Sequence, residues 1–352
     1  MRHRIVFALA TASAVVVARP ASATDCSGLL SPCVDSDILW PHAGPAHFQA
    51  VGSADTVAER QLGFGLVAAY LSRPLVIALR SPGNSSDQYA VDDQVNTTFL
   101  WSYGVTNRLE LDFALPLTVV QSGTGLAPVT GGNGLNDTSV RDLRFGFAYA
   151  LVARRRIDGD PHPDPCSSRD TCPDNLGLVG RLEVSAPSGD RSQFAGERSG
   201  TFVPSLAADY QRGRWFAGAE LGLRVRPTTE LLGTRIGSQV VTSMGIGANI
   251  LRHELLSATL EAWALPDLVG QDTLVLSNGR YTNQSNGQVL VPAEWMLSIR
   301  TAPVTGGDLS IQLGGGGALP LTDDSVLSPR WRFVLSLRWD PLAHDTHRTA
   351  AP

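Results

Sequence analysis

The chain has 352 residues, of which 43% are hydrophobic, and its 28 basic and 33 acidic residues give a net charge of −5. This mild acidity, without basic clusters, argues against nucleic-acid binding. A mean hydropathy of +0.01 is too polar for a bundle of membrane helices but normal for a membrane β-barrel, in which only every second strand residue faces lipid.

Residues 1–23 have the features of a removable signal peptide. Arg2 and Arg4 provide a basic start, residues 5–17 are largely apolar, and residues 21–23 form a small-residue cleavage site. No later stretch approaches the roughly 18 consecutive apolar residues that a membrane-spanning helix needs. The chain is therefore predicted to be exported and could be periplasmic, secreted or an outer-membrane barrel.

Four cysteines form two close pairs in the sequence, Cys26 with Cys33 and Cys166 with Cys172. In an oxidising compartment such pairs predict two local disulfides, and their spacings are poor for zinc. Residues 24–60 are interrupted by Pro, Ser and Ala and alternate only weakly. We expect them to form an N-terminal periplasmic segment or a partial plug.

From residue 61 onward, apolar and polar residues alternate with the period of a β-strand. Leu109, Leu111 and Phe113, for example, alternate with Glu110 and Asp112. Twelve segments follow this pattern, at approximately 61–71 (or 61–79), 91–105, 107–120, 140–153, 175–186, 201–211, 214–226, 235–250, 255–266, 292–302, 308–317 and 329–339.

The connections between these segments are alternately short and long, which is the pattern of an outer-membrane barrel with short periplasmic turns. The long ones include 121–139 and 267–291. Residues 154–174 depart from the pattern, because they fall on the short-turn side but are long. Their acidic run from Asp158 to Asp174 faintly resembles a calcium loop, but it lacks the downstream bidentate Glu, so a solvated acidic turn is the better interpretation and no metal site is predicted.

Alternation alone also fits a soluble exported β-protein whose apolar face points to a core. Three features favour a membrane barrel: strands of 10 to 15 residues, whereas soluble strands average about 5–6; aromatic residues near strand ends; and charged residues confined to the polar parity. The aromatic residues expected at the membrane interface are Trp101, Tyr103, Trp215, Trp331 and Trp339.

An Arg facing lipid would cost roughly 2–4 kcal/mol at the bilayer midplane, whereas opposite charges in a lumen can pair and meet water. The mid-strand charges are therefore candidates to line a pore: Arg108, Glu110, Asp112, Asp142, Arg144, Arg181, Glu183, Glu220, Arg224, Glu261, Glu294, Arg300 and Arg332. They could form a paired ladder that fills the lumen, or an eyelet that selects small polar or charged solutes.

Residues 103–111, Tyr-Gly-Val-Thr-Asn-Arg-Leu-Glu-Leu, and the following Ala114-Leu115-Pro116 resemble a hairpin of transporter-like outer-membrane barrels of Gram-negative bacteria, including myxobacteria. The final segment at 330–339 resembles their closing strand, whose terminal aromatic residue is read by the barrel-assembly machinery. The resemblance implies a transporter-like barrel over residues 61–339. The chain lacks the OmpA-like domain that often follows such barrels, and thirteen residues follow its closing strand.

An enzyme is not expected. None of the seven histidines falls in a predicted strand, so a catalytic triad on the barrel wall is improbable, and the glycine clusters at 123–134 and 314–317 lack the lysine of a phosphate-binding loop. An outer-membrane lipid hydrolase remains a rival hypothesis that a hydrolysis assay would test.

The sequence thus predicts an all-β, antiparallel up-and-down transmembrane barrel of about 12 strands at 61–339, followed by a tail at 340–352. We expect it in the outer membrane with both termini in the periplasm, in contact with lipid and, during biogenesis, with the barrel-assembly machinery. No cofactor is expected. The expected function is a passive channel or transporter-like pore for small solutes, polar ones included; the alternative is a non-conducting structural or surface-interaction barrel that acts through its long loops.

Overall fold

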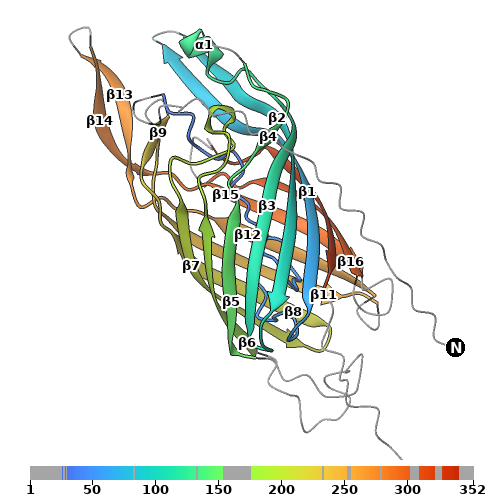
Figure 1. Ribbon diagram of the computed structural model, residues 1–352. Coiled ribbons are helices and arrows are strands. Elements are labelled where there is room, and N and C mark those ends of the chain that lie inside the picture. Colours follow the sequence, from blue (N-terminus) through green and yellow to red (C-terminus); the bar gives the residue numbers. More distant parts are fainter. Residues whose placement is uncertain are drawn as a thin grey trace, which may run out of the picture.

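Twelve antiparallel strands form a closed barrel in the computed structural model (Figure 1). Closure occurs where β1 pairs with β17, from Phe64 opposite Trp339 to Ser72 opposite Trp331. The barrel strands are β1 (Leu62–Ser81), β2 (Asn84–Gly104), β3 (Leu109–Ser122), β5 (Arg144–Val152), β6 (Leu176–Ser185), β7 (Thr201–Arg212), β8 (Trp215–Arg224), β11 (Gln239–Asn249), β12 (Leu256–Ala264), β15 (Ala293–Thr301), β16 (Leu309–Ala318) and β17 (Trp331–Trp339). Each falls on one of the twelve predicted segments, so the predicted fold class is confirmed.

The structure describes residues 26, 28, 30–81, 84–131, 134–153, 176–231, 234–251, 255–277, 280–301, 309–321 and 327–340. The predicted signal peptide, the Cys166–Cys172 pair, the acidic turn at 158–174 and the tail beyond Asp340 lie outside these residues. Within the described part of the chain, no helix is long and apolar enough to cross a bilayer.

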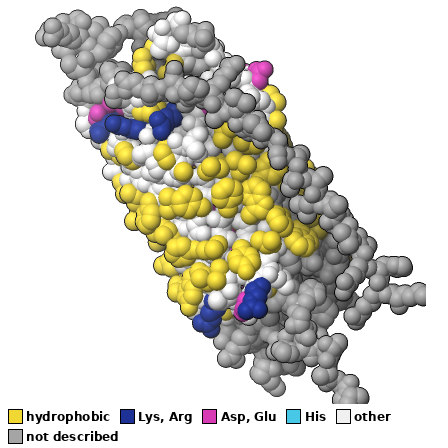
Figure 2. Space-filling model, viewed as in Figure 1, with side chains coloured by type: hydrophobic (Ala, Val, Ile, Leu, Met, Phe, Trp, Pro, Cys, Tyr) yellow, Lys and Arg dark blue, Asp and Glu magenta, His cyan; other side chains and the backbone are white. Residues whose placement is uncertain are grey.

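The apolar parity of the strands faces outward. Phe113, Leu223 and Leu335 are 40%, 45% and 44% exposed, whereas Glu110 and Arg224, on the opposite parity, are 0% and 4% exposed. This arrangement would be inside out for a soluble protein and is the one that lipid requires. Figure 2 shows the result as an apolar band around the visible wall, with charged side chains gathered toward its two ends.

The two ends of the barrel differ. At the short-turn end, residues 105–108 join β2 to β3, and Gly213 and Arg214 join β7 to β8. The other, long-loop end carries α1 (Ala127–Thr130), β4 (Ser139–Val140), η1 (Arg191–Gln193), and two hairpins, β9 (Thr229–Leu231) with β10 (Thr234–Ile236) and β13 (Gly270–Ser277) with β14 (Arg280–Val289).

β1 and β2 extend further than the sequence indicated. Their pairing continues from Ser72 opposite Asp93 to Ser81 opposite Asn84, where a loop was expected at 81–90. The register shifts next to Leu75, close to Arg73, which has φ of 53°. A β-bulge of this kind bends a strand and increases its twist, which breaks the strict alternation by which a strand is recognised in sequence.

We predict that the energetic cost of an outward-facing charge depends on its position along the strand. Leu335→Arg, at the middle of β17, should lower the free energy of unfolding in lipid vesicles by about 2–4 kcal/mol, because its guanidinium would lie near the bilayer midplane. Leu62→Arg, at the short-turn end of β1, is the matched control and should cost about 0–1 kcal/mol. Equal effects in denaturant titrations of the two folded variants would contradict the proposed membrane position.

Candidate functional site

The lumen is traversed by the segment of residues 31–60, called here the lumen segment. At its start, the N–H of Ser31 donates to the carbonyl of Glu230 on the β9–β10 hairpin, 3.1 Å away, at the long-loop end. At its finish, the N–H of Arg60 donates to the carbonyl of Gly104 at the short-turn end of β2, 2.7 Å away. The segment therefore runs the length of the barrel before it enters β1, as the dark blue trace in Figure 1 shows.

Inward carboxylates of the wall bind backbone N–H groups along this segment. Glu261 on β12 accepts from Gln49, at 3.0 Å, and from Ala50, at 2.8 Å. Three further wall carboxylates accept one N–H each: Glu220 on β8 from Gly52, Asp209 on β7 from Ala54, and Glu110 on β3 from Val57. The segment has no strand partner here, so the acidic side chains satisfy donors that a sheet would otherwise satisfy.

Inward arginines bind the carbonyl groups of the same segment. Arg338 donates to the carbonyls of His42 and Gly44, at 2.8 and 2.9 Å. The other contacts are Arg181 to the carbonyl of Ser53 at 2.8 Å, Arg144 to that of Pro41 at 3.2 Å and Arg224 to that of Ile38 at 3.3 Å. Acidic and basic wall residues thus hold complementary groups of one backbone.

A buried cluster of ion pairs holds the first part of the segment. Asp37 lies 2.9 Å from Arg332 and 3.2 Å from Arg141, and Arg141 also lies 2.6 Å from Asp35. On the wall, Arg332 donates to both carboxylate oxygens of Glu294, at 2.7 and 2.9 Å. The two arginines and Glu294 are at most 3% exposed, so each charge depends on its partner for stabilisation.

Two ring side chains of the segment lie among wall charges. The ring of Trp40 lies 4.9 Å from the guanidinium of Arg144 and 4.4 Å from that of Arg224, both within the range of cation–π attraction. The ring nitrogens of His42 lie 3.1 Å from Glu220 and 3.5 Å from Glu183. Both nitrogens can act as donors only when the imidazole is protonated.

Little free volume remains around the lumen segment. Two cavities beside the segment have volumes of about 10 Å³ each, which is about the space of one water molecule. One lies beside Cys33 and Arg226, and the other beside Trp40 and Arg144. The lumen in this state is filled by the segment and its charged partners.

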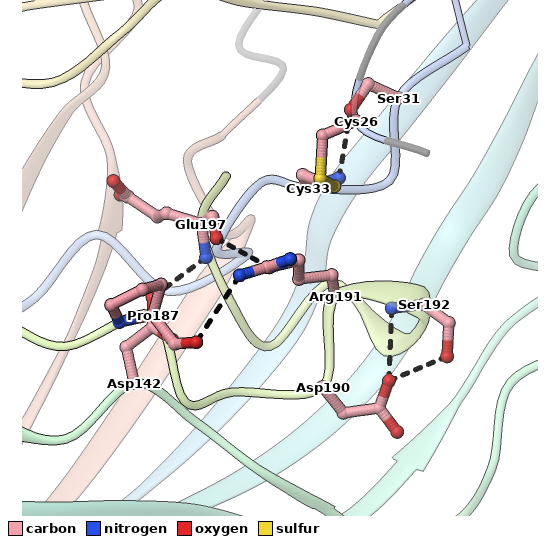
Figure 3. Close-up of a disulfide and its surroundings, with 9 residues drawn as sticks. All are labelled: Cys26, Ser31, Cys33, Asp142, Pro187, Asp190, Arg191, Ser192 and Glu197. Carbon is pink, nitrogen blue, oxygen red and sulfur yellow. Dashed lines mark hydrogen bonds between the residues drawn. A yellow bond between two sulfur atoms is a disulfide. The ribbon is translucent and has the colours of Figure 1, made fainter. Parts of the chain in front are cut away.

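The predicted Cys26–Cys33 disulfide is confirmed, with its Cα atoms 5.6 Å apart. It lies at the long-loop end near the loop between β6 and β7, which Asp142 holds in place (Figure 3). Asp142 accepts from the N–H groups of Gly189, at 2.7 Å, and Glu197, at 2.8 Å. Burial raises the pKa of Asp142 to about 6, against the effect of these two hydrogen bonds, which lower it.

The structure brings most of the thirteen predicted charged residues together around the lumen segment. Eleven are buried: Glu110, Asp112, Asp142, Arg144, Arg181, Glu183, Glu220, Arg224, Glu261, Glu294 and Arg332. Arg300 is half-buried and lies 3.2 Å from the Nδ1 of His47. Arg108 does not join them: it is exposed in the turn between β2 and β3, because β3 begins only at Leu109.

Several residues of the site were not among the candidates. Asp209 and Arg338 have the parity of their inward neighbours Ala207 and Ser336, so strict alternation along β7 and β17 would have identified them. Arg141 precedes β5 in a short irregular stretch, where parity gives no signal. The contacts of the lumen segment had no sequence signal at all, because its partners lie on strands far away in the chain.

The five predicted interface aromatics lie on the outer wall. Tyr103, Trp215, Trp331 and Trp339 are 39–53% exposed and Trp101 is half-buried. Trp101 packs against Phe113, and Trp339 stacks on Phe64 across the β1–β17 junction. Trp331 lies toward the long-loop end and the others toward the short-turn end, as expected of side chains at two interfaces.

No protein-family model and no curated protein matches this sequence. Solved structures resemble it in fold. A COG4313 outer membrane channel from Pseudomonas putida F1 is 14% identical, with 82% of this chain and 98% of that one covered and a TM-score of 0.46. The NanC porin is 9% identical, with 79% and 100% covered and a TM-score of 0.43. A Pseudomonas aeruginosa FadL homologue is 10% identical, with 86% and 99% covered and a TM-score of 0.39.

We predict that Arg332→Met lowers the free energy of unfolding by about 3–5 kcal/mol, because it leaves Glu294 and Asp37 buried without their shared partner. The measurement is a denaturant titration of the refolded barrel. Arg330→Met, two residues away and exposed, is the matched control and should change stability by less than about 0.5 kcal/mol. Adding Glu294→Met to Arg332→Met should recover part of the loss, and similar effects of the two single substitutions would refute this role of the cluster.

Proposed function

We propose that the protein is an outer-membrane pore for small solutes whose passage is closed, in the state described here, by the lumen segment. The observation that carries the proposal is the way in which this segment is held. It crosses the whole lumen, yet its backbone is bound by acidic and basic side chains of the wall and not by strand pairing.

The chemistry of these contacts suits a segment that moves. Hydrogen bonds from backbone groups to ionised side chains can be exchanged for hydrogen bonds to water, so release would leave the wall charges hydrated. Stretches of small residues reduce the apolar surface that a movement would expose: residues 43–46 are Ala-Gly-Pro-Ala, and residues 50–54 are Ala-Val-Gly-Ser-Ala.

The exposed apolar band and the aromatic residues at its two ends support a position in lipid, with the short turns toward the periplasm. In this orientation the long-loop end faces the outside of the cell. The lumen segment then starts at the outer mouth and finishes on the periplasmic side, where Trp339 also lies. This proposal keeps the end of β17 periplasmic but departs from the sequence-based expectation of a periplasmic N-terminal end.

The filled lumen also favours a second candidate, a non-conducting barrel that acts through its long loops. Cavities of about 10 Å³ admit no solute larger than water without rearrangement. The two candidates differ in one respect that can be measured: a pore needs the lumen segment to move, and a structural barrel does not.

A disulfide between the segment and the wall should close the pore. A Cβ atom placed on Gly52 would lie 3.3 Å from the Cβ of Ala207 on β7, near the separation found in disulfides. We predict that the oxidised Gly52→Cys/Ala207→Cys variant shows no single-channel steps in planar bilayers and that a reducing agent restores the steps of the wild type. Each single variant and the wild type, with and without reductant, are the controls, since the native disulfide is also reduced.

Deleting residues 34–57 should give the converse result, with larger and longer-lived steps than the wild type. If the oxidised double variant conducts as the wild type does, solutes do not pass by movement of this segment. If the folded deletion variant is also silent at every voltage, the structural barrel is the better description.

We also predict that the start of the lumen segment is accessible on intact cells. An epitope inserted after Gly28, an exposed residue at which an added Cβ atom would meet nothing within 4 Å, should bind antibody without permeabilisation of the outer membrane. The same epitope after Gly213, in the exposed turn between β7 and β8, is the matched control and should bind only after permeabilisation. The opposite pattern would reverse the proposed orientation of the barrel.

A further inference from the structure

The ring of Phe48 is seated on a pair of wall glycines. Gly218 on β8 and Gly245 on β11 are direct partners in the barrel register, and both face the lumen. A Cβ atom on Gly245 would lie 2.5 Å from Cε1 of Phe48, and one on Gly218 would lie 3.1 Å from Cε2. Only glycine at both positions leaves space for the ring, so the pair forms a notch in the wall.

Apolar side chains border this notch. The ring of Phe216 lies 5.6 Å from that of Phe48 and is tilted by 53°, and Val51 belongs to the same buried cluster. Phe216 in turn lies over Gly247, where a Cβ would come within 2.3 Å of its ring. Phe48, Val51 and Phe216 are at most 4% exposed. The notch is thus an apolar slot with a backbone floor and an aromatic side.

Two hydrogen-bond acceptors flank the slot. Glu261 is the register partner of Gly245 on its other side, and Glu220 lies two residues beyond Gly218 on the same face of β8. In the closed state Glu261 accepts the N–H groups of Gln49 and Ala50, which directly follow Phe48, and Glu220 accepts that of Gly52. One short stretch of the lumen segment therefore supplies both a ring for the slot and donors for the carboxylates.

We propose that this notch is a binding site for a small solute with an aromatic ring and an N–H or O–H donor, which takes the place of Phe48 and its neighbouring backbone. The inference rests on the proposed function, since the site becomes vacant only when the lumen segment moves. The solute's ring occupies the Gly218–Gly245 slot against Phe216, and its donor binds Glu261 or Glu220.

The ring and the donor are each required for a physical reason. The slot is shaped for a flat group, because the ring of Phe48 fills the space between the backbone floor and the ring of Phe216. Ring pairs of this geometry add to the binding free energy beyond the effect of their buried area. When Gln49 and Ala50 withdraw, Glu261 loses both backbone donors and must take replacements from water or from a solute. A solute that supplies both groups stabilises the open state and so shifts the population toward it.

The test is calorimetric titration of the purified, detergent-solubilised barrel with benzylamine. Phe48→Ala, which vacates the slot, should bind benzylamine about tenfold or more tightly than the wild type, because Phe48 no longer competes. Adding Gly245→Val should abolish this binding. Adding Gly180→Val instead is the matched control: Gly180 alternates with the inward Val179 and Arg181 on β6, a Cβ there meets nothing closer than 3.8 Å, and binding should be unchanged.

Cyclohexylmethylamine carries the same donor on a non-planar ring and should bind Phe48→Ala much more weakly than benzylamine. Equal binding of the two amines, or retention of binding in Phe48→Ala/Gly245→Val, would overturn the proposal. The heat-modifiable migration of folded barrels in detergent gels reports whether each variant has folded. If Phe48→Ala does not fold, Phe48→Leu, which fills the slot less completely than Phe, should show a smaller gain over the wild type.

Binding in detergent is independent of conductance, so the two proposals fail separately. If benzylamine binding depends on Gly245 but the barrel never conducts, the proposed pore function is refuted and the proposed binding site is supported. If the disulfide of the Gly52→Cys/Ala207→Cys variant controls conductance but no Phe48 variant binds benzylamine, the pore function is supported and the binding site is refuted.

Discussion

An irregular backbone inside a membrane barrel must have a hydrogen-bonding partner for each of its buried N–H and C=O groups. Along the lumen segment, acidic and basic side chains of the wall bind many of these groups. Glu261, Glu220, Asp209 and Glu110 accept its N–H groups, while Arg338 and Arg181 donate to its carbonyls. The charges of the wall are therefore neither a self-contained ladder nor a vacant eyelet. They bind the backbone of the irregular lumen segment, and the closed state depends on these contacts.

The same wall faces lipid on its other side, which explains why the charges are so strictly placed. A shift of one residue in the register of β3 would turn Glu110 and Asp112 toward the acyl chains and Phe113 toward the lumen. A carboxylate on the lipid face would lack both water and partner. The alternation that identifies the strands in the sequence and the partners that hold the lumen segment are thus two results of one constraint.

This constraint also sets what could be predicted from the sequence. Alternation over the long strands predicted all twelve barrel strands and most of the inward charges, because each residue's face depends only on parity. It failed where parity is interrupted: at Arg108, one residue before β3 begins, and at the bulge beside Arg73, beyond which β1 and β2 continue. The hairpin β13–β14 lies within 267–291, a stretch that was expected to be a long loop. The path of the lumen segment could not be predicted, since Asp37 meets Arg332 across nearly the whole chain.

The arrangement of opposite charges on the inner face of the wall bears on how such a lumen could open. Arg181 lies 3.6 Å from Asp112 and Arg144 lies 3.9 Å from Glu183, in each case while the arginine also donates to a carbonyl of the lumen segment. If that carbonyl withdraws, the guanidinium keeps an acidic partner within reach and meets entering water on its free side. Arg181 and Arg144 therefore keep an acidic partner when the segment withdraws, whereas Arg141, whose partners Asp35 and Asp37 both lie on the segment, loses them. Each wall charge that keeps a partner lowers the free energy of the open state relative to the closed one, and a smaller difference between the two states is one that a solute shifts more readily.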